Sequence, residues 1–110
     1  MPHSVDKLLI DVRIACEEVQ SFTYGQTFEM FLSNRLLQLA LEREFEIIGE
    51  ALVRLERIDA EHLELHIPEY RKIIGFRNLV AHGYDIIDDA ALWDLAQTHV
   101  PELLRKIEQY

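Results

Sequence analysis

The sequence is poor in the residues that mark secreted, membrane-spanning or irregular proteins. Its 110 residues include one cysteine, three prolines and four glycines. A single thiol excludes an internal disulfide, and Cys16 falls on an apolar helical stripe, so we interpret it as a small core residue rather than a nucleophile. No run approaches the ~18 apolar residues that a membrane span needs, and the first residues contain no apolar segment typical of a signal peptide. We therefore expect a cytoplasmic protein.

Positive charge is also scarce. Eleven Lys and Arg residues stand against 20 Asp and Glu residues, which gives a formal net charge of −9. This charge opposes non-specific binding to nucleic acid, because such binding depends on neutralising phosphates. It does not exclude a local phosphate site, for which Arg71, Lys72 and Arg77 are candidates, and an acidic surface also suits a basic partner protein.

Helical periodicity is abundant. Apolar residues recur at helical spacing over residues 4–22, with Ser4 as the expected N-cap, and again from residue 27 to about 55–58 without a proline. The second of these helices carries apolar residues on two faces. One face should meet the core and the other a second subunit, because both must be buried.

The second half of the chain predicts shorter helices. Residues 58–67 have weak periodicity and are interpreted as a connection, after which Pro68 suits the first position of a helix that ends near residue 82. Another helix is expected over residues 88–99, capped by the acids around Asp88, and Pro101 should break or kink the chain before a last helix over 102–109. The sequence thus predicts one all-α domain, residues 1–110, folded as an antiparallel up-down bundle of four to five helices that forms a homodimer.

The helix before residue 82 ends in three chemically capable side chains, Arg77, His82 and Tyr84. Arg77 lies on the apolar face of this helix, where a charged guanidinium requires a structural or functional explanation. On an unbroken helix, Arg77 and His82 would diverge by roughly 140°. Gly83 is suited to end the helix, since glycine reaches positive φ without steric cost, and the side chains can then converge.

The spacing Arg-x4-His-x-Tyr resembles the signature of the HEPN superfamily, and the chain is most similar to its HepT-like branch. The resemblance extends over residues 5–108. It also includes segments around the motif in the same order, namely Glu46 to Ala51, Ile67-Pro68, Ile73 to Gly75, Asp85 to Asp88, Leu92-Trp93 and Val100 to Leu103.

This resemblance implies a homodimeric toxin that cleaves RNA without a metal ion or cofactor. Arg77 and His82 would form the catalytic pair, completed across the dimer interface, and Asn78 would help to hold the phosphate or His82. Histidine titrates near working pH and suits general acid–base catalysis, while arginine suits a developing phosphorane charge. The resemblance further implies a nucleotidyltransferase antitoxin as partner, which transfers AMP to Tyr84.

Each site residue also has a structural interpretation. Arg77 could form a buried ion pair with Glu46 or Glu50, which share one face of the long helix; this pair would orient Arg77. His82 could simply stabilise a helix C-terminus, and Tyr84 could pack at the surface. His62 and His66 lie four apart, as two metal ligands would, but no third ligand is evident and we interpret them as a solvated stretch. Trp93 is expected in the core or an interface.

Two further functions remain open beside the ribonuclease toxin. The first is a non-catalytic module that binds nucleotide or RNA and associates with a nucleotidyltransferase, which the acidic charge favours. The second is a plain structural dimer. The intact set of Arg77, His82 and Tyr84 favours the ribonuclease.

Overall fold

The computed structural model describes the backbone of residues 2–81 and 88–110 and the side chains of residues 5–76 and 88–110. The described chain is helical and contains no strand, which confirms the all-α prediction. Within this part of the chain, no helix is long and apolar enough to cross a membrane.

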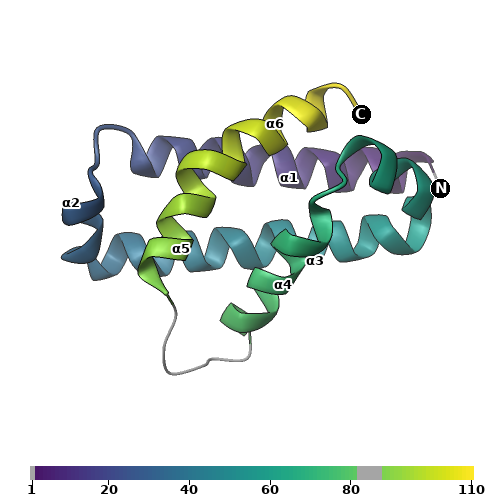
Figure 1. Ribbon diagram of the computed structural model, residues 1–110. Helices are drawn as coiled ribbons and strands as arrows, with labels where there is room; N and C mark the ends of the chain where they lie inside the picture. Colours follow the sequence, from purple (N-terminus) through teal and green to yellow (C-terminus); the bar gives the residue numbers. More distant parts are fainter. Residues whose placement is uncertain (1, 82–87) are drawn as a thin grey trace.

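Two long helices form the frame of the molecule. Helix α1 (Pro2–Thr23) and helix α3 (Arg35–His66) lie side by side and run in opposite directions (Figure 1). The turn after α1 contains Gly25 at φ 73°, a conformation that glycine adopts without steric cost. The helix begins at Pro2, so Ser4 lies inside it and its prediction as N-cap was wrong.

The prediction of one unbroken helix from residue 27 was wrong, because a short helix α2 (Phe28–Leu32) precedes α3. Asn34 separates the two helices, and its side chain accepts a hydrogen bond from the Leu37 amide at 3.0 Å, which caps α3. Gln38 stabilises the end of α2 on the other side of the break. Its amide donates to the carbonyl oxygens of Phe31 at 2.9 Å and Leu32 at 3.1 Å, which have no helical partner.

The interpretation of residues 58–67 as a connection was also wrong. Helix α3 continues to His66, with one non-helical residue, Asp59, at φ −147° and ψ 46°. Leu63 is fully buried beyond this kink and ties the last part of α3 to the core. Pro68 lies in the following turn rather than in the first turn of helix α4 (Tyr70–Ala81).

The C-terminal part returns along the frame as α5 (Asp89–Asp94), a π-helical turn over Leu95–His99, and α6 (Val100–Glu108). Asp88 caps α5 by accepting from the amides of Ala90 at 3.0 Å and Ala91 at 3.3 Å, which confirms the predicted cap. Pro101 does not break the helix. The π-helical turn directly before it offers a physical reason, since wider i→i+5 bonding accommodates a missing N–H and the bulk of the proline ring.

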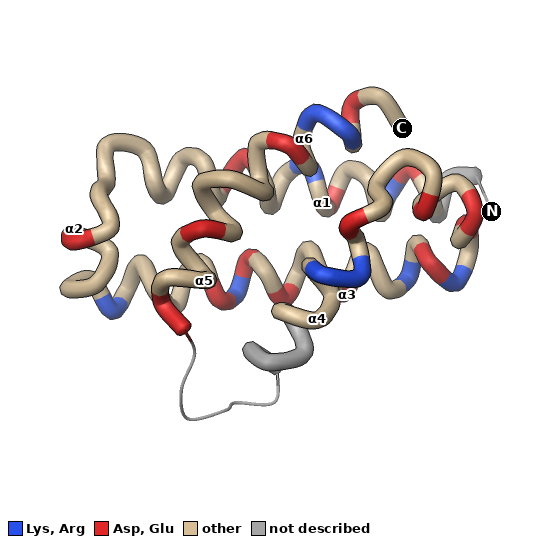
Figure 2. The backbone as a smooth tube through the Cα atoms, in the orientation of Figure 1, with Lys and Arg blue, Asp and Glu red and all other residues tan. Residues whose placement is uncertain are grey.

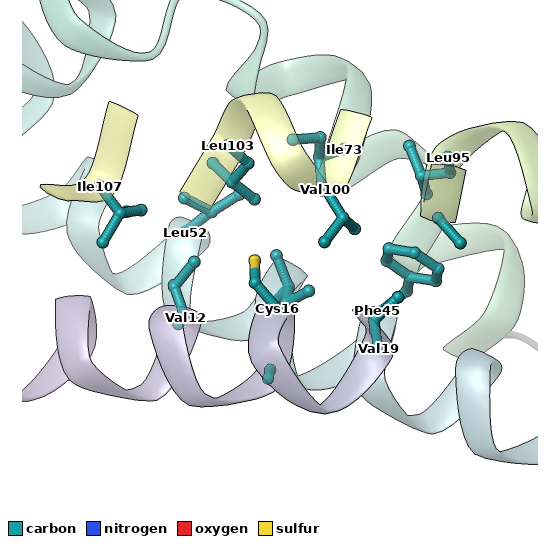
Figure 3. Close-up of a cluster of buried hydrophobic side chains, with 14 of the residues drawn as sticks. Val12, Cys16, Val19, Phe45, Leu52, Ile73, Leu95, Val100, Leu103 and Ile107 are labelled. Carbon is teal, nitrogen blue, oxygen red and sulfur yellow. The ribbon is translucent and has the colours of Figure 1, made fainter. Parts of the chain in front are cut away.

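The core lies between α1, α3 and α6, with α4 packed on α3 (Figure 3). Val12, Cys16 and Val19 of α1 are fully buried and face Leu52 of α3 and Leu103 of α6. Cys16 is therefore a core residue, as predicted. Burial, together with the nearby Glu44 carboxyl, raises the pKa of its thiol to about 12, which makes a nucleophilic thiolate unavailable at neutral pH.

Candidate active site at the end of helix α4

The Arg-x4-His-x-Tyr motif lies at the C-terminal end of α4 and beyond it. The backbone of Arg77 and Asn78 belongs to α4. Their side chains, and all of His82 and Tyr84, lie outside the described residues. The roles predicted for these four residues stay predictions, and the described geometry is that of the elements around them.

Helix α4 is fixed against α3 by aromatic side chains. Tyr70 is 1% exposed and its hydroxyl donates to Glu56 at 2.6 Å, a bond that raises the pKa of the phenol. One turn later Ile73 is 2% exposed, and the Phe76 ring meets the Phe45 ring edge-on at 6.0 Å between centroids. These contacts confirm the apolar face that the sequence predicted for this helix, and they leave position 77 directly after an anchored residue.

Carboxylates of α3 lie beside the anchor. Glu46 follows Phe45 in the chain and forms an ion pair with Arg43 at 3.5 Å, while Glu50 pairs with Arg54 at 3.3 Å. Both carboxylates are partly exposed. The predicted pairing of Arg77 with Glu46 or Glu50 lies outside the described side chains and stays a prediction.

The start of α5 brings a further carboxylate, that of Asp89, close to α3. The pKa of Glu42 is raised mainly by burial, and the nearby carboxylates of Asp89 and Glu46 raise it further, whereas Arg35 at 3.7 Å lowers it. Asp89 of α5 therefore lies near Glu42 of α3. A cation placed among these carboxylates gains stability, because it lowers their mutual repulsion.

The remaining sequence candidates fall elsewhere. Arg71 lies 3.8 Å from Glu56 and 3.6 Å from Glu64, so the predicted basic cluster is partly neutralised by α3. Trp93 is partly buried and packs against the core through Phe31, at 5.1 Å between ring centroids, in keeping with the prediction of a core or interface position.

The prediction that His62 and His66 form a solvated stretch was wrong, because both side chains belong to a contact cluster. Their rings lie 4.2 Å apart, and the His62 ring stacks on Tyr110 at 4.4 Å. Asp59 accepts the Tyr110 hydroxyl at 2.8 Å and lies 3.3 Å from His62 Nδ1. No group of three side chains suited to a metal ion occurs among the described residues.

Sequence reasoning missed one buried ionisable residue, Glu44 of α3, which is 5% exposed. Burial raises its pKa to about 7, with further contributions from the charge of Glu18 and a hydrogen bond to that side chain. The position of Glu44 in the helical repeat of α3 already indicated that it is buried. Glu44 lies three residues after Leu41 and four before Ile48, both fully buried, and so falls on the core face.

Comparison with known proteins adds information that covers the motif. A family model described as "Ribonuclease HepT-like" matches residues 12–110. A protein of Thermococcus cleftensis named "Probable ribonuclease HepT" is 33% identical over 109 residues, covering 99% of this chain and 97% of that protein. A protein of Methanocaldococcus jannaschii named "Putative RNase MJ1380" is 30% identical, and the match covers 94% of this chain and 94% of that protein. Another protein of the same organism, named "Putative RNase MJ1216", is 27% identical, and the match covers 96% of this chain and 85% of that protein. No solved structure matches the chain significantly.

Proposed function

Because the chain belongs to the HepT-like ribonuclease family of the HEPN superfamily, we propose that it is an endoribonuclease and the toxin of a toxin–antitoxin pair. One observation carries the proposal: the family match over residues 12–110 includes a complete Arg-x4-His-x-Tyr motif. The contact of Phe76 with Phe45, the residue before Glu46, supports a charged site at this end of α4.

The proposed reaction needs no metal ion. His82 removes the proton of a ribose 2′-hydroxyl, whose oxygen attacks the adjacent phosphorus, and the bond from phosphorus to the 5′-oxygen breaks. A second acid gives its proton to that leaving oxygen. Arg77 binds the non-bridging oxygens as negative charge develops on the phosphorane, while Asn78 helps to hold the phosphate or His82.

A homodimer would supply the second histidine, since each chain contributes one copy of the motif. The outer surface of α3 supports this part of the proposal. Leu36 is 78% exposed and Leu39 is 46% exposed, and Val53 is half-buried. Large apolar side chains on a helix whose opposite face is already in the core favour burial by a second subunit. We propose that the bundle is antiparallel and that the composite site forms where two such surfaces meet.

Tyr84 is the proposed site of control. Transfer of AMP to its hydroxyl by a partner nucleotidyltransferase antitoxin would place bulk and negative charge two residues from His82 and would block the phosphate site. Mass spectrometry after co-expression with such an enzyme should detect an added AMP on wild type and none on Tyr84→Phe. Full modification of Tyr84→Phe would show that the acceptor is another residue.

The second candidate is a module that binds nucleotide or RNA without cutting it, in association with a nucleotidyltransferase. The net charge of −9 favours it, because this charge weakens attraction to an RNA substrate.

The deciding experiment is cleavage of total cellular RNA by the purified protein in EDTA, with His82→Ala as control. Fragments from wild type alone are expected. Equal cleavage by both proteins would contradict the role of His82. No cleavage by a protein that is dimeric and unmodified at Tyr84 would favour the binding module.

A further inference from the structure

An open cleft lies between the end of α1, the turn that follows it and the π-helical turn before α6. Its volume is about 460 Å³, which is within the range of small-molecule sites in proteins. Two of its lining residues, Thr23 and Ala96, are buried at 7% and 2% exposure. None of the described residues that line the cleft belongs to α3, so the cleft is separate from the surface that we assign to the dimer.

The cleft is uncharged within a highly charged chain. The described residues that line it include no Asp, Glu, Lys, Arg or His, although 28% of the residues of the chain are charged. Two stretches of sequence, residues 19–28 and 95–101, contain no Asp, Glu, Lys or Arg and supply most of the lining. Figure 2 shows tan backbone over the turn between α1 and α2 and over the segment before α6. Without a cation for a phosphate or a carboxylate for an amine, the cleft suits a neutral ligand.

Three glutamine side chains line this cleft from distant parts of the chain. Gln20 belongs to α1, Gln26 to the turn after it and Gln97 to the π-helical turn. None of the three amide groups forms a hydrogen bond with a described residue. Each amide therefore has two N–H donors and a carbonyl acceptor available to a ligand.

Tyr24 adds an aromatic ring to the amides. It is 88% exposed, and its ring and hydroxyl make no contact of their own with another described side chain. An exposed aromatic ring is a surface on which a planar nucleobase can stack. A glutamine amide pairs with the N6 donor and the N7 acceptor of adenine, whereas the two acceptors of guanine pair with Arg or Lys, which the described lining lacks.

We propose that this cleft binds a neutral adenine base, carried either by a free nucleoside or by an unpaired nucleotide of RNA. Tyr24 stacks on the face of the base, and the glutamine amides bind its edge. A phosphate on the attached sugar gains nothing, because no cation lines the cleft. The inference goes beyond the proposed function and requires no contact with the motif.

The test is titration of the ¹⁵N-labelled protein with adenosine, followed by the amide chemical shifts of residues 20–26 and 95–101. The dissociation constant should be on the order of 0.1 mM, as for a small ligand of this size. It should be the same at low and high salt, and AMP should bind no more tightly than adenosine, because no phosphate is neutralised. Tighter binding of AMP, or a steep dependence on salt, would overturn the neutral cleft.

Variants test the two kinds of contact. Tyr24→Ala removes the stacking surface and should weaken adenosine binding roughly tenfold. Gln97→Ala removes one hydrogen-bonding edge and should weaken it roughly fivefold. Gln109→Ala is the matched control for Gln97→Ala, since Gln109 is also exposed but does not line the cleft, and it should keep the wild-type affinity. Equal affinities for the two glutamine variants would contradict the role of the amides.

A 2′-O-methyl oligoadenylate and ribose separate the sources of the ligand. The oligonucleotide lacks the free 2′-hydroxyl and is not consumed by a nuclease of the proposed kind. If it shifts the same amides and Tyr24→Ala weakens the effect, the base is recognised in RNA; a response to adenosine alone assigns the cleft to a free nucleoside. The same shifts with ribose as with adenosine would overturn the choice of a base, and no shifts with either adenine ligand at millimolar concentration would overturn the site. RNA cleavage enters none of these outcomes, so the proposed nuclease and the cleft stand or fall separately.

Discussion

Glu44 of α3 is hydrogen-bonded to Glu18 of α1, and the two acids bridge the long helices while Glu44 is almost fully buried. Two neighbouring carboxylates cannot both ionise without cost, so Glu18 adds to the effect of burial in raising the pKa of Glu44. Arg43 lowers the pKa of Glu44 only in part, because burial and Glu18 raise it more. The packing of α1 on α3 is therefore linked to pH.

The first prediction is that stability falls as pH rises from about 4.5 to about 7. The folded state holds the proton on Glu44 up to about pH 7, whereas an unfolded carboxyl releases it near its ordinary value of 4.5. The folded state thus binds more protons within this window, and the free energy of unfolding decreases by at most about 3 kcal/mol across it. Urea unfolding at several pH values, followed by circular dichroism, measures this slope.

Glu44→Gln and Glu17→Gln separate this effect from the general charge of the chain. Glu44→Gln should flatten the slope and be more stable than wild type at pH 8, because the amide needs no proton to donate to Glu18. Glu17→Gln removes the same charge from an exposed position of α1 and should keep the wild-type slope. If both variants had identical profiles, the link between Glu44 and pH would be wrong.

Most of the helices could be predicted from the sequence because their signals are local. The apolar stripes of α1 and α4 and the Asp88 cap all depend on residues within a few positions. The break at Asn34 was missed because Gln38 stabilises it from seven residues after Phe31. The end of α3 was missed for a similar reason, since Tyr110, which packs on His62 and Asp59, comes from the other end of the chain.

A second prediction concerns the core. Leu52 is fully buried between α1 and α6, so Leu52→Ala removes apolar contacts and leaves a cavity. The expected loss is about 2–5 kcal/mol in the free energy of unfolding. Leu65→Ala is the control for the same change at a position that is 76% exposed, and it should stay within about 0.5 kcal/mol of wild type. Equal losses in urea unfolding would contradict the placement of Leu52 in the core.

A third prediction concerns the start of α3. Asn34→Ala removes the hydrogen bond to the Leu37 amide and should destabilise the protein by about 1 kcal/mol, whereas Asn34→Gly should cost only a few tenths because glycine tolerates the extended cap conformation. Thermal unfolding of both variants measures the difference. An unchanged stability of Asn34→Ala would contradict the capping role of Asn34.

The site could be predicted as a motif but not as a geometry. The resemblance to the HEPN signature pointed to Arg77, His82 and Tyr84, since that pattern depends on residue types at fixed separations, and their roles stay predictions. The charge on the neighbouring elements could not be found in this way. Asp89 and Glu46 both raise the pKa of Glu42 although they lie 43 residues apart, and only the packing of α5 near α3 brings them together.

The last prediction tests whether Arg77 acts through its planar fork or through charge alone. Arg77→Lys keeps the positive charge but cannot donate two parallel hydrogen bonds to the non-bridging oxygens of a phosphorane. If Arg77 stabilises the transition state as proposed, the rate of RNA cleavage should fall by about a hundredfold or more, as for removal of one donor to a developing oxyanion. Arg105→Lys makes the same exchange in α6, where Arg105 pairs with Glu102 at 3.2 Å, and should leave the rate unchanged. Single-turnover cleavage of one labelled RNA by the two variants makes the comparison, with circular dichroism to establish that both are folded. A wild-type rate for Arg77→Lys would mean that a point charge is sufficient at this position and that the bidentate role assigned to Arg77 is wrong.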